Sequence, residues 1–444
     1  MAQQNRRSGT GKQPEQDRKG SGRTEASQGQ QSDWLDNWLS IEPDGTIQAA
    51  SGKVELGTGT RTALAQIVAE ELDVPFERVR MVMGDTGRTP DEGYTAGSMT
   101  VQASGSALRQ AAAEARLALL EMAAEELDAD LKELAVQDGA IYVARDPERK
   151  ISYAELMGGA KFNRPVSGKA PLKRPEEYRI VGKDTPRVDI PGKLTGEPSY
   201  IQDLKVPGML HAHMVHPPGP GAQFVSMDTG SLANVPGLVK IFQQGNFIGI
   251  VAEHEEQAIQ AAKQLKVEWK EFPVLPRMDD LYAFLRSQPT DDVVLADVGD
   301  LEQSLKQAAR QFQSTYYQPY HAHASIGPSC AIADVQADRI TIWSSTTGPY
   351  PLRSALAQML GEPDEKVHII YVEGAASYGH NGADDVPAEA AVLSRAVGRP
   401  VRVQWSREDE FIWEPKAPAA VMEVRGGLDA QGNVIAWDYH VWSP

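Results

Sequence analysis

Cysteine is almost absent from this chain, and its scarcity limits the chemistry that the chain can perform alone. Cys330 is the one cysteine among 444 residues. A single thiol forms no disulfide framework within the chain and cannot supply a four-cysteine metal site. Any iron–sulfur cluster that works with this protein is therefore expected on another polypeptide.

Long apolar runs and an excess of basic residues are also missing. No stretch of about 18 consecutive apolar residues occurs, so no membrane span is expected. The formal net charge is −17 and no basic stripe is present, which argues against nucleic-acid binding. Hydrophobic residues make up 41% of the chain, which suits a globular protein, and the length allows two or three domains.

Residues 1–32 contain no valine, isoleucine, leucine or aromatic residue and carry a net charge of +3. Such a segment cannot bury enough apolar surface to offset the entropy of ordering, so we expect a disordered tail, with a functional basic arm as the alternative. Arg6 and Arg7 resemble the start of a twin-arginine signal, but no hydrophobic stretch follows them. We therefore expect a cytoplasmic location, while export alongside a partner stays open.

The most informative pattern lies at residues 374–385. A strand predicted over 367–372 leads into a turn that contains Gly374, Gly379 and Gly382, and a helix is predicted to follow. Glycine lets the backbone approach a ligand closely, and a helix start offers free N–H groups with a positive dipole end. The pattern indicates a site for a phosphate or a polar cofactor ring, with a ligand-free turn as the alternative.

A second glycine turn, at Gly57 and Gly59, precedes a helix predicted over residues 61–72. On this helix Glu70 and Glu71 are expected to face solvent. No Gly-Lys-Ser/Thr sequence follows either turn, so neither is a Walker phosphate loop. The third glycine of the dinucleotide fingerprint is also missing at the required offset.

Other elements follow from periodicity and turn residues. They are a hairpin over 38–51, a strand over 79–83, a helix over 105–127, a hairpin over 134–143, a linker over 161–186, and an α+β unit with strands at 206–215, 239–242 and 247–252 and a helix at 255–265. A further α/β region is expected from about residue 301, and it carries the Gly374 turn.

Seven segments match one protein family in order along the chain. They are residues 52–59, 63–72, 84–86, 93–98, 325–330, 374–385 and 399–410. On these segments the chain resembles the molybdenum-binding subunit of the xanthine dehydrogenase/aldehyde oxidase family. Within that family it is most similar to the branch that contains the large subunits of isoquinoline 1-oxidoreductase and nicotinate dehydrogenase. The resemblance extends from about Trp34 to the last residue.

The resemblance implies an α+β fold in four parts. A disordered tail (1–32) precedes an N-terminal molybdopterin-binding segment (33–180), an a/b hammerhead domain (181–300) and the first part of a further molybdopterin-binding domain (301–444). The implied cofactor is molybdenum–molybdopterin, with the cytosine dinucleotide form as one option. The implied reaction hydroxylates an aldehyde or an N-heteroaromatic with oxygen from water and passes electrons to an iron–sulfur small subunit.

The same resemblance assigns ten residues to the cofactor, because backbone N–H groups in glycine loops suit pterin and phosphate oxygens. These residues are Gly57, Thr58, Gly59, Thr95, Gly97, Ser98, Thr347, Gly374, Tyr378 and Gly379. No side chain is assigned as a metal ligand. Thr58 and Thr347 depart from the family, since many relatives have glutamine there. The turn at 375–377 also lacks the glycine and cysteine of relatives.

The catalytic residue stays unassigned, because the glutamate base of the family lies in a lobe beyond the point that matches Pro444. Glu197 and Glu362 occur in Gly-Glu-Pro triplets but are expected to be turn residues. The apolar strand at 434–442 leaves an open edge. We therefore expect a fragment, a split subunit, or a strand that another chain completes by supplying the missing lobe. Two hypotheses remain: an enzyme subunit that is inactive as this chain alone, and a non-catalytic or partial subunit.

Two further patterns are weaker. His211 and His213 are expected to share a strand face, as are His321 and His323, and metal ligation is kept as an alternative to ordinary buried or solvated histidines. Residues 407–410 are expected to form an ion-pair cluster at the protein surface.

Overall fold

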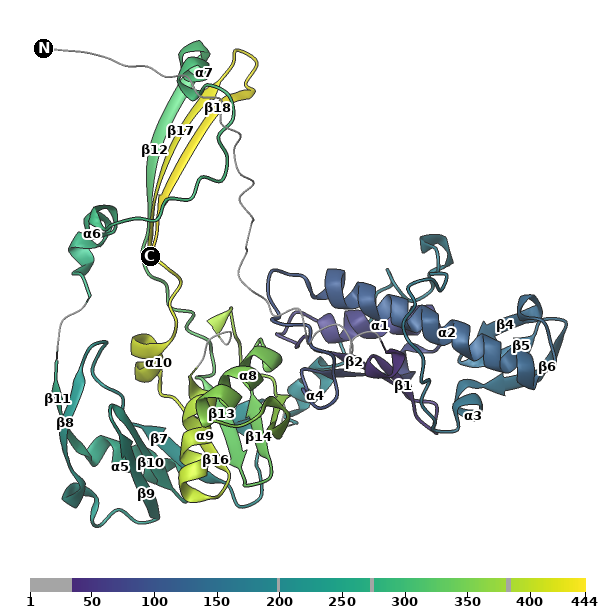
Figure 1. Ribbon diagram of the computed structural model, residues 1–444, viewed down its shortest axis with the longest axis horizontal. Helices are drawn as coiled ribbons and strands as arrows, with labels where there is room; N and C mark the ends of the chain where they lie inside the picture. The colour runs from purple at the N-terminus through teal and green to yellow at the C-terminus, as the bar shows by residue number, and fades with distance from the viewer. Residues whose placement is uncertain (1–33, 198–199, 272–274, 381–384) are drawn as a thin grey trace, which may run out of the picture.

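The computed structural model describes residues 34–197, 200–271, 275–380 and 385–444, so the predicted tail at 1–32 and Gly382 lie outside the described residues. The protein has three parts (Figure 1). A helical N-terminal part lies beside a central seven-stranded sheet, and a three-stranded antiparallel sheet extends away from both as an arm. This mixture of helices and strands confirms the predicted α+β class. Within the described residues, no helix has the length and apolar character needed to cross a bilayer.

The N-terminal part is built on two helices that pack against a small sheet. Its strands are β1 (Leu39–Ile41), β2 (Ile47–Ser51) and β3 (Val79–Met83), and its main helices are α1 (Thr60–Leu72) and α2 (Ser106–Glu126). Strand β2 pairs antiparallel with β1 and parallel with β3. The pairing of β1 with β2 confirms the predicted hairpin. Leu64, Val68 and Leu72 are buried on one face of α1, which confirms the predicted helix.

A second small sheet and a long irregular segment complete this part. The sheet contains β4 (Leu134–Gln137), β5 (Ala140–Val143) and β6 (Asp146–Ser152), followed by α3 (Tyr153–Met157). The prediction that Glu70 and Glu71 face solvent is wrong, because both are at most 2% exposed. Glu70 accepts backbone N–H bonds from Arg179, Ile180 and Val181, at 2.9, 2.6 and 3.0 Å.

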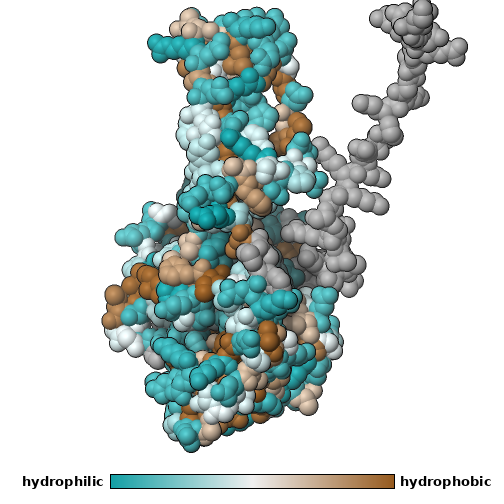
Figure 2. Space-filling view, turned by 90° about the vertical axis from the view of Figure 1, so that its left-hand side faces the viewer, coloured by the Kyte–Doolittle hydropathy of each residue, from teal (hydrophilic) through white to brown (hydrophobic). Residues whose placement is uncertain are grey.

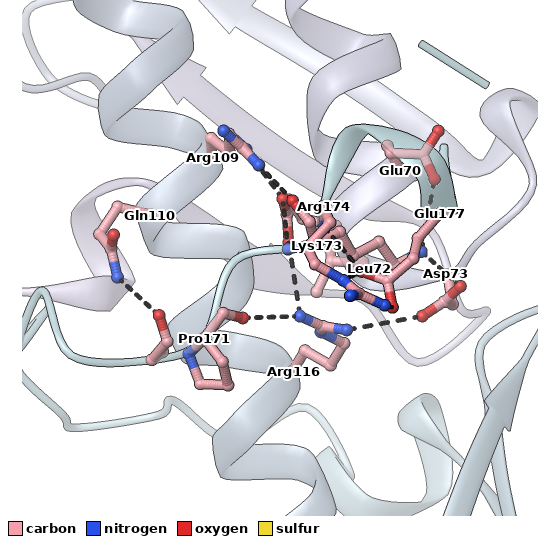
Figure 3. Close-up of polar contacts among 12 residues, drawn as sticks. Glu70, Leu72, Asp73, Arg109, Gln110, Arg116, Pro171, Lys173, Arg174 and Glu177 are labelled. Atoms are coloured by element: carbon pink, nitrogen blue, oxygen red, sulfur yellow. Dashed lines mark hydrogen bonds and ion pairs between the residues drawn. The ribbon is translucent and has the colours of Figure 1, made fainter. Parts of the chain in front are cut away.

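Glu71, the next residue of α1, makes similar contacts. It pairs with Arg109 at 2.9 Å and accepts a hydrogen bond from the backbone N–H of Lys173. Figure 3 shows neighbouring contacts of the same region, in which Arg116 of α2 donates to the Pro171 carbonyl and pairs with Asp73 at the end of α1. Residues 171–181, predicted as a linker, therefore pack against α1 and α2 through buried carboxylates. Helical periodicity did not predict the burial of Glu70 and Glu71, because the segment that covers them is distant in sequence.

The central sheet has the strand order β15-β14-β13-β16-β7-β10-β9. Its strands are β7 (Leu210–Met214), β9 (Leu238–Gln244), β10 (Phe247–Ala252), β13 (Cys330–Val335), β14 (Ile340–Ser344), β15 (Val367–Tyr371) and β16 (Val401–Gln404). Helices α5 (Glu255–Gln264), α8 (Pro349–Leu360) and α9 (Val386–Val397) pack against it. Parallel pairing of β16 with β7 joins segments far apart in the sequence into one sheet.

The arm is formed by β12 (Arg310–Gln318), β17 (Ala420–Leu428) and β18 (Val434–Trp442), with β17 in the middle. Figure 2 shows it as a narrow extension above a wider body. The smaller elements between these parts are α4 (Ile190–Thr195), β8 (Gln223–Asp228), β11 (Lys266–Lys270), α6 (Leu281–Ser287), α7 (Leu301–Gln307) and α10 (Arg407–Trp413). Strand β18 pairs with β17 and leaves its other edge open within the described residues.

The N-terminal part meets the central sheet at its outer strand β15. The Tyr371 N–H donates to the Gly84 carbonyl at 3.0 Å, and the Tyr371 hydroxyl donates to the Glu55 carbonyl. A carbon atom added at Gly84 would lie 2.5 Å from Val54 and 2.7 Å from Tyr371. Only glycine fits at position 84. The contacts of Tyr371 with Gly84 and Glu55 bring the end of β15 close to the segment that leads into the Gly57 turn.

Candidate functional site

The turn after β15 approaches its neighbours closely at Gly374. A side chain there would begin 2.8 Å from the Cβ of Ser345, which follows β14. Further along, Ala376, Tyr378 and Gly379 have φ angles of +89°, +54° and +99°. Left-handed backbone is unusual for alanine and tyrosine and tends to persist where a site requires it. The Tyr378 side chain is 63% exposed, so its ring contributes little to the core.

The start of α1 differs from the expected phosphate site. The buried Glu55 carboxylate accepts hydrogen bonds from the N–H groups of Gly59, at 3.0 Å, and Arg61, at 2.8 Å. These N–H groups are therefore satisfied by a carboxylate of the chain itself. Gly57, with φ of +86°, and Thr58 remain exposed, and nothing lies within 4 Å of the position that a Gly57 side chain would take.

Ion pairs connect the two glycine turns. Arg187 donates to the Gly57 carbonyl at 2.7 Å and pairs with Asp189, which also pairs with Lys193 at 2.8 Å. Lys193 in turn pairs with Glu373, the residue before Gly374. Hydrogen bonds from Arg187 hold the pKa of Asp189 well below its usual range, so this carboxylate stays ionised. The connection holds the two turns in a fixed relation.

A third connection joins the predicted residues Thr95 and Thr347. The Thr95 N–H donates to the Thr347 carbonyl at 2.7 Å, and the Thr95 hydroxyl accepts from the Val54 N–H at 2.9 Å. Thr347 is only 5% exposed. Gly97 and Ser98 lie two and three residues further along, in an exposed loop where both have positive φ. Thr95 thus contacts Thr347 directly, and Gly374 packs against Ser345, two residues before Thr347. The Gly57 turn is linked to the Gly374 turn through the ion pairs of Arg187, Asp189, Lys193 and Glu373.

Sequence reasoning missed a buried polar cluster next to this turn. His380, Glu410 and Glu414 are all at most 3% exposed, and one ligand atom from each lies within 4.8 Å of the others. The Glu410 carboxylate accepts from the N–H of Ser329 at 2.7 Å and pairs with Arg407 at 2.6 Å. The prediction of a surface ion-pair cluster at 407–410 is therefore wrong for Glu410, which faces inward from α10.

Burial sets the protonation of this cluster. Loss of solvent lowers the pKa of His380 below its ordinary value, although the nearby Glu414 opposes the shift, so the imidazole is neutral near pH 7. Loss of solvent also raises the pKa of Glu410, against the hydrogen bonds from Ser329 and the charge of Arg407. A neutral imidazole and two carboxylates together can bind either a proton or a cation.

Of the two histidine pairs that were expected to share a strand face, one does so and the other does not. His211 and His213 do lie on the same face of β7, and His213 is 3.9 Å from Asp409. His321 and His323 lie outside the named strands, where His321 makes an isolated bridge. The backbone N–H of His323 donates to Glu414 at 2.6 Å, so this histidine borders the buried cluster.

The glycine turns fit a polar cofactor better than the cavities do. Gly57 and Gly379 have positive φ, and a side chain at Gly379 would meet only the His323 ring, at 3.8 Å. Both therefore present open backbone on which a pterin or phosphate can lie. By contrast, cavities of 190, 600 and 360 Å³ have none of the ten predicted residues in their walls.

Comparisons with known proteins identify two cofactor-binding domains in the chain. Two family models, each described as a molybdopterin cofactor-binding domain, match residues 2–193 and 286–444. A nicotinate dehydrogenase subunit of Pseudomonas putida is 45% identical over 92% of this chain and 35% of its own length. The beta subunit of isoquinoline 1-oxidoreductase from Brevundimonas diminuta is 28% identical over 90% of this chain and 59% of its own length.

A solved structure supports the fold alone. Aldehyde oxidoreductase from Desulfovibrio gigas superposes with a TM-score of 0.51 at 20% identity, over 65% of this chain and 37% of that one. The fold and the matched domains define a molybdopterin-binding protein. The chain belongs to the molybdenum-binding subunits of the xanthine dehydrogenase/aldehyde oxidase family. It spans 35% and 59% of the length of these two curated relatives.

Proposed function

We propose that this chain is the cofactor-binding part of a molybdenum hydroxylase that oxidises an aldehyde or an N-heteroaromatic compound. The observation that carries the proposal is that hydrogen bonds and a series of ion pairs hold the Gly57 turn, Thr95, Thr347 and the Gly374 turn together. The same chain matches two molybdopterin-binding domains. Glycine turns that are distant in sequence and held together in space suit an extended cofactor with a pterin and phosphates.

The residues of this chain would hold and orient the cofactor. The turn with Gly374, Tyr378 and Gly379 is assigned to the pterin, with the exposed backbone at Tyr378 and Gly379 facing it and Gly374 packed against Ser345. The Gly57 and Gly97 turns are assigned to the pterin or its nucleotide phosphates. The Arg187–Asp189–Lys193–Glu373 ion pairs fix the position of the Gly57 turn relative to the Gly374 turn. When bound, the molybdenum group supplies the oxygen transfer and accepts the electrons of the substrate.

The proposal includes partners and a location. Because the chain has one cysteine, the iron–sulfur cluster that receives the electrons lies on a separate subunit. The glutamate base comes from a further lobe, which belongs to another polypeptide or to a longer chain. The open edge of β18 is one place for such a lobe to join. The cytosine dinucleotide form is one option for the cofactor in this proposal, and the proposed location is cytoplasmic, with export alongside a partner as the alternative.

A second candidate function is a partial subunit that binds the cofactor weakly or not at all. It is favoured by Thr58 and Thr347, where many relatives have glutamine, and by the Glu55 carboxylate that already satisfies the start of α1. Thr347 is buried and its carbonyl is engaged with Thr95, which limits its reach.

Metal and pterin analysis separates the two functions. The chain is purified after expression alone and together with its genomic neighbours, and molybdenum, oxidised fluorescent pterin and released nucleotide are measured per chain. Cofactor in the co-expressed complex supports the hydroxylase, and released cytidine monophosphate identifies the dinucleotide form. A correctly folded complex without molybdenum or pterin supports the partial subunit instead.

A further inference from the structure

We propose that His380, Glu410 and Glu414 bind a divalent transition-metal cation of the zinc class, separate from the molybdenum cofactor. The three residues come from two places in the chain, the end of the Gly374 turn and helix α10 with the residue after it. All three are buried, and their ligand atoms lie within 4.8 Å of one another. A tetrahedral zinc ion holds such atoms about 3.3 Å apart, so small side-chain rotations complete the site.

Several buried polar atoms of this cluster and its neighbour His323 have no hydrogen-bond partner among the described residues. Within the described part of the chain, His380 Nδ1 and Glu414 Oε2 are buried without a hydrogen-bond partner, and they lie 3.5 Å apart. His323 Nδ1, 4.0 Å from Glu414 Oε1, is likewise buried and unbonded. A buried polar atom without a partner is costly, and a bound cation would satisfy several of them at once.

The surroundings of the three residues resemble the outer shell of a metal site. His380 Nε2 lies 3.1 Å from the Ser329 hydroxyl, which leaves Nδ1 as the ligand atom. Glu410 is oriented by Ser329 and Arg407, and Glu414 by the N–H of His323. Metal-ligating histidines and carboxylates are usually fixed through their second nitrogen or oxygen, as His380 and Glu414 are here. Both oxygens of Glu410 already accept hydrogen bonds, so this carboxylate would bind the ion through a remaining lone pair.

The nearby Lys416 does not occupy the proposed site, and the ligand types indicate which ion the site would bind. Lys416 is nearby, but its ammonium donates to the backbone carbonyls of Glu410 and Glu414, at 3.1 and 3.2 Å, and leaves Glu414 Oε2 without a hydrogen bond. One imidazole nitrogen with two carboxylates suits Zn²⁺, Mn²⁺ or Fe²⁺, whereas Mg²⁺ prefers oxygen ligands and water. The ion would join the Gly374 turn to α10, whether or not a pterin is present.

Metal retention by the full chain tests this proposal. Chain stripped with a chelator is incubated with ZnCl₂ or MgCl₂ and desalted, and bound metal is measured by mass spectrometry beside a melting curve. We expect about one zinc per chain, a higher melting temperature with zinc, and no retained magnesium. His380→Ala and Glu414→Gln should abolish retention, and Ser329→Ala, a milder change, should weaken zinc binding about tenfold or more.

Matched control variants are His368→Ala and Glu362→Gln, which alter a partly exposed histidine and a partly exposed glutamate outside the cluster. Both should retain zinc like the unaltered chain. The proposal is overturned if the unaltered chain retains no zinc, which would indicate a shared proton between His380 and Glu414. It is also overturned if folded His380→Ala and Glu414→Gln proteins retain as much zinc as the controls. Molybdenum and pterin are counted separately, so failure here leaves the proposed function intact.

Discussion

His216 lies mostly buried between two carboxylates, which shift its pKa strongly. Its ring nitrogens lie 2.9 Å from Asp409 and 2.8 Å from Glu389, and its edge meets Trp405. Burial alone would lower the pKa of His216, but the hydrogen bonds to the two carboxylates raise it to about 9. The charged ring therefore helps to join β7, α9 and α10.

This environment predicts how stability changes with pH. The folded pKa lies above the ordinary value of 6.5, so the stabilisation is fully present below pH 6.5 and is lost as the pH rises through about 9. We expect His216→Gln to lower the free energy of unfolding by up to about 3 kcal/mol at pH 6 and by much less at pH 9.5. Urea unfolding at both pH values measures the difference. His254→Gln, at an exposed position, is the control, and an equal loss at both pH values would contradict the account.

At the scale of elements, the 171–181 segment depends on two carboxylates of α1. Burial alone would raise the pKa of Glu70, but the hydrogen bonds from three backbone N–H groups lower it below its ordinary value. We expect Glu70→Ala to destabilise the protein by about 2–3 kcal/mol, because the three buried donors lose their partner. Hydrogen exchange should accelerate at residues 179–181.

The control for this change is Glu77→Ala, which removes an exposed glutamate after the same helix. It should alter stability by less than about 0.5 kcal/mol. Unchanged exchange at 179–181 in Glu70→Ala protein would show that other contacts hold the segment.

Local patterns predicted most elements but few long-range contacts. The strand at 367–371, the helix from 386 and its end at Gly398 follow from apolar periodicity, Pro387 and a left-handed glycine, which are all local. The burial of Glu70 and Glu410 depends on partners 109 and 81 residues away in sequence. Periodicity in a single sequence carries no information about such partners, so both were expected at the surface.

The same limit applies to the candidate site. Family resemblance selected Gly57, Thr95, Thr347 and Gly374, and the structure links them through specific contacts. Their assignment to the cofactor stays a prediction. The His380 cluster left no local pattern, because Glu410 and Glu414 lie 30 and 34 residues beyond the histidine and each alone is an ordinary residue. One weak clue was the four-residue spacing of Glu410 and Glu414, which brings the two side chains to the same side of the last turn of α10 and the residue after it.

At the scale of the whole molecule, the chain has too few cysteines to pass electrons onward. With Cys330 as the one cysteine of its sequence, the chain cannot supply the four cysteine ligands of an iron–sulfur cluster. We expect the purified chain to reduce no dye with any aldehyde or N-heteroaromatic, and dye reduction to appear only when iron–sulfur and base-bearing polypeptides are added. Substrate-dependent reduction by the chain alone would contradict this expectation.

The most direct test of the central claim is the cofactor content of Gly379→Val protein, expressed with its genomic partners. Valine is unfavourable at a φ of +99° and would block the backbone approach of a pterin. Gly432→Val is the matched control, since Gly432 has a φ of +88° and open space around it in the distant β17–β18 turn. Both changes carry a similar backbone strain of about 1–3 kcal/mol.

Molybdenum and pterin are measured per folded chain, alongside a melting curve for each variant. The account predicts that Gly379→Val protein folds but retains almost no cofactor, while Gly432→Val protein retains as much as the unaltered chain. Full cofactor content in folded Gly379→Val protein would contradict the placement of the molybdopterin at the Gly374 turn.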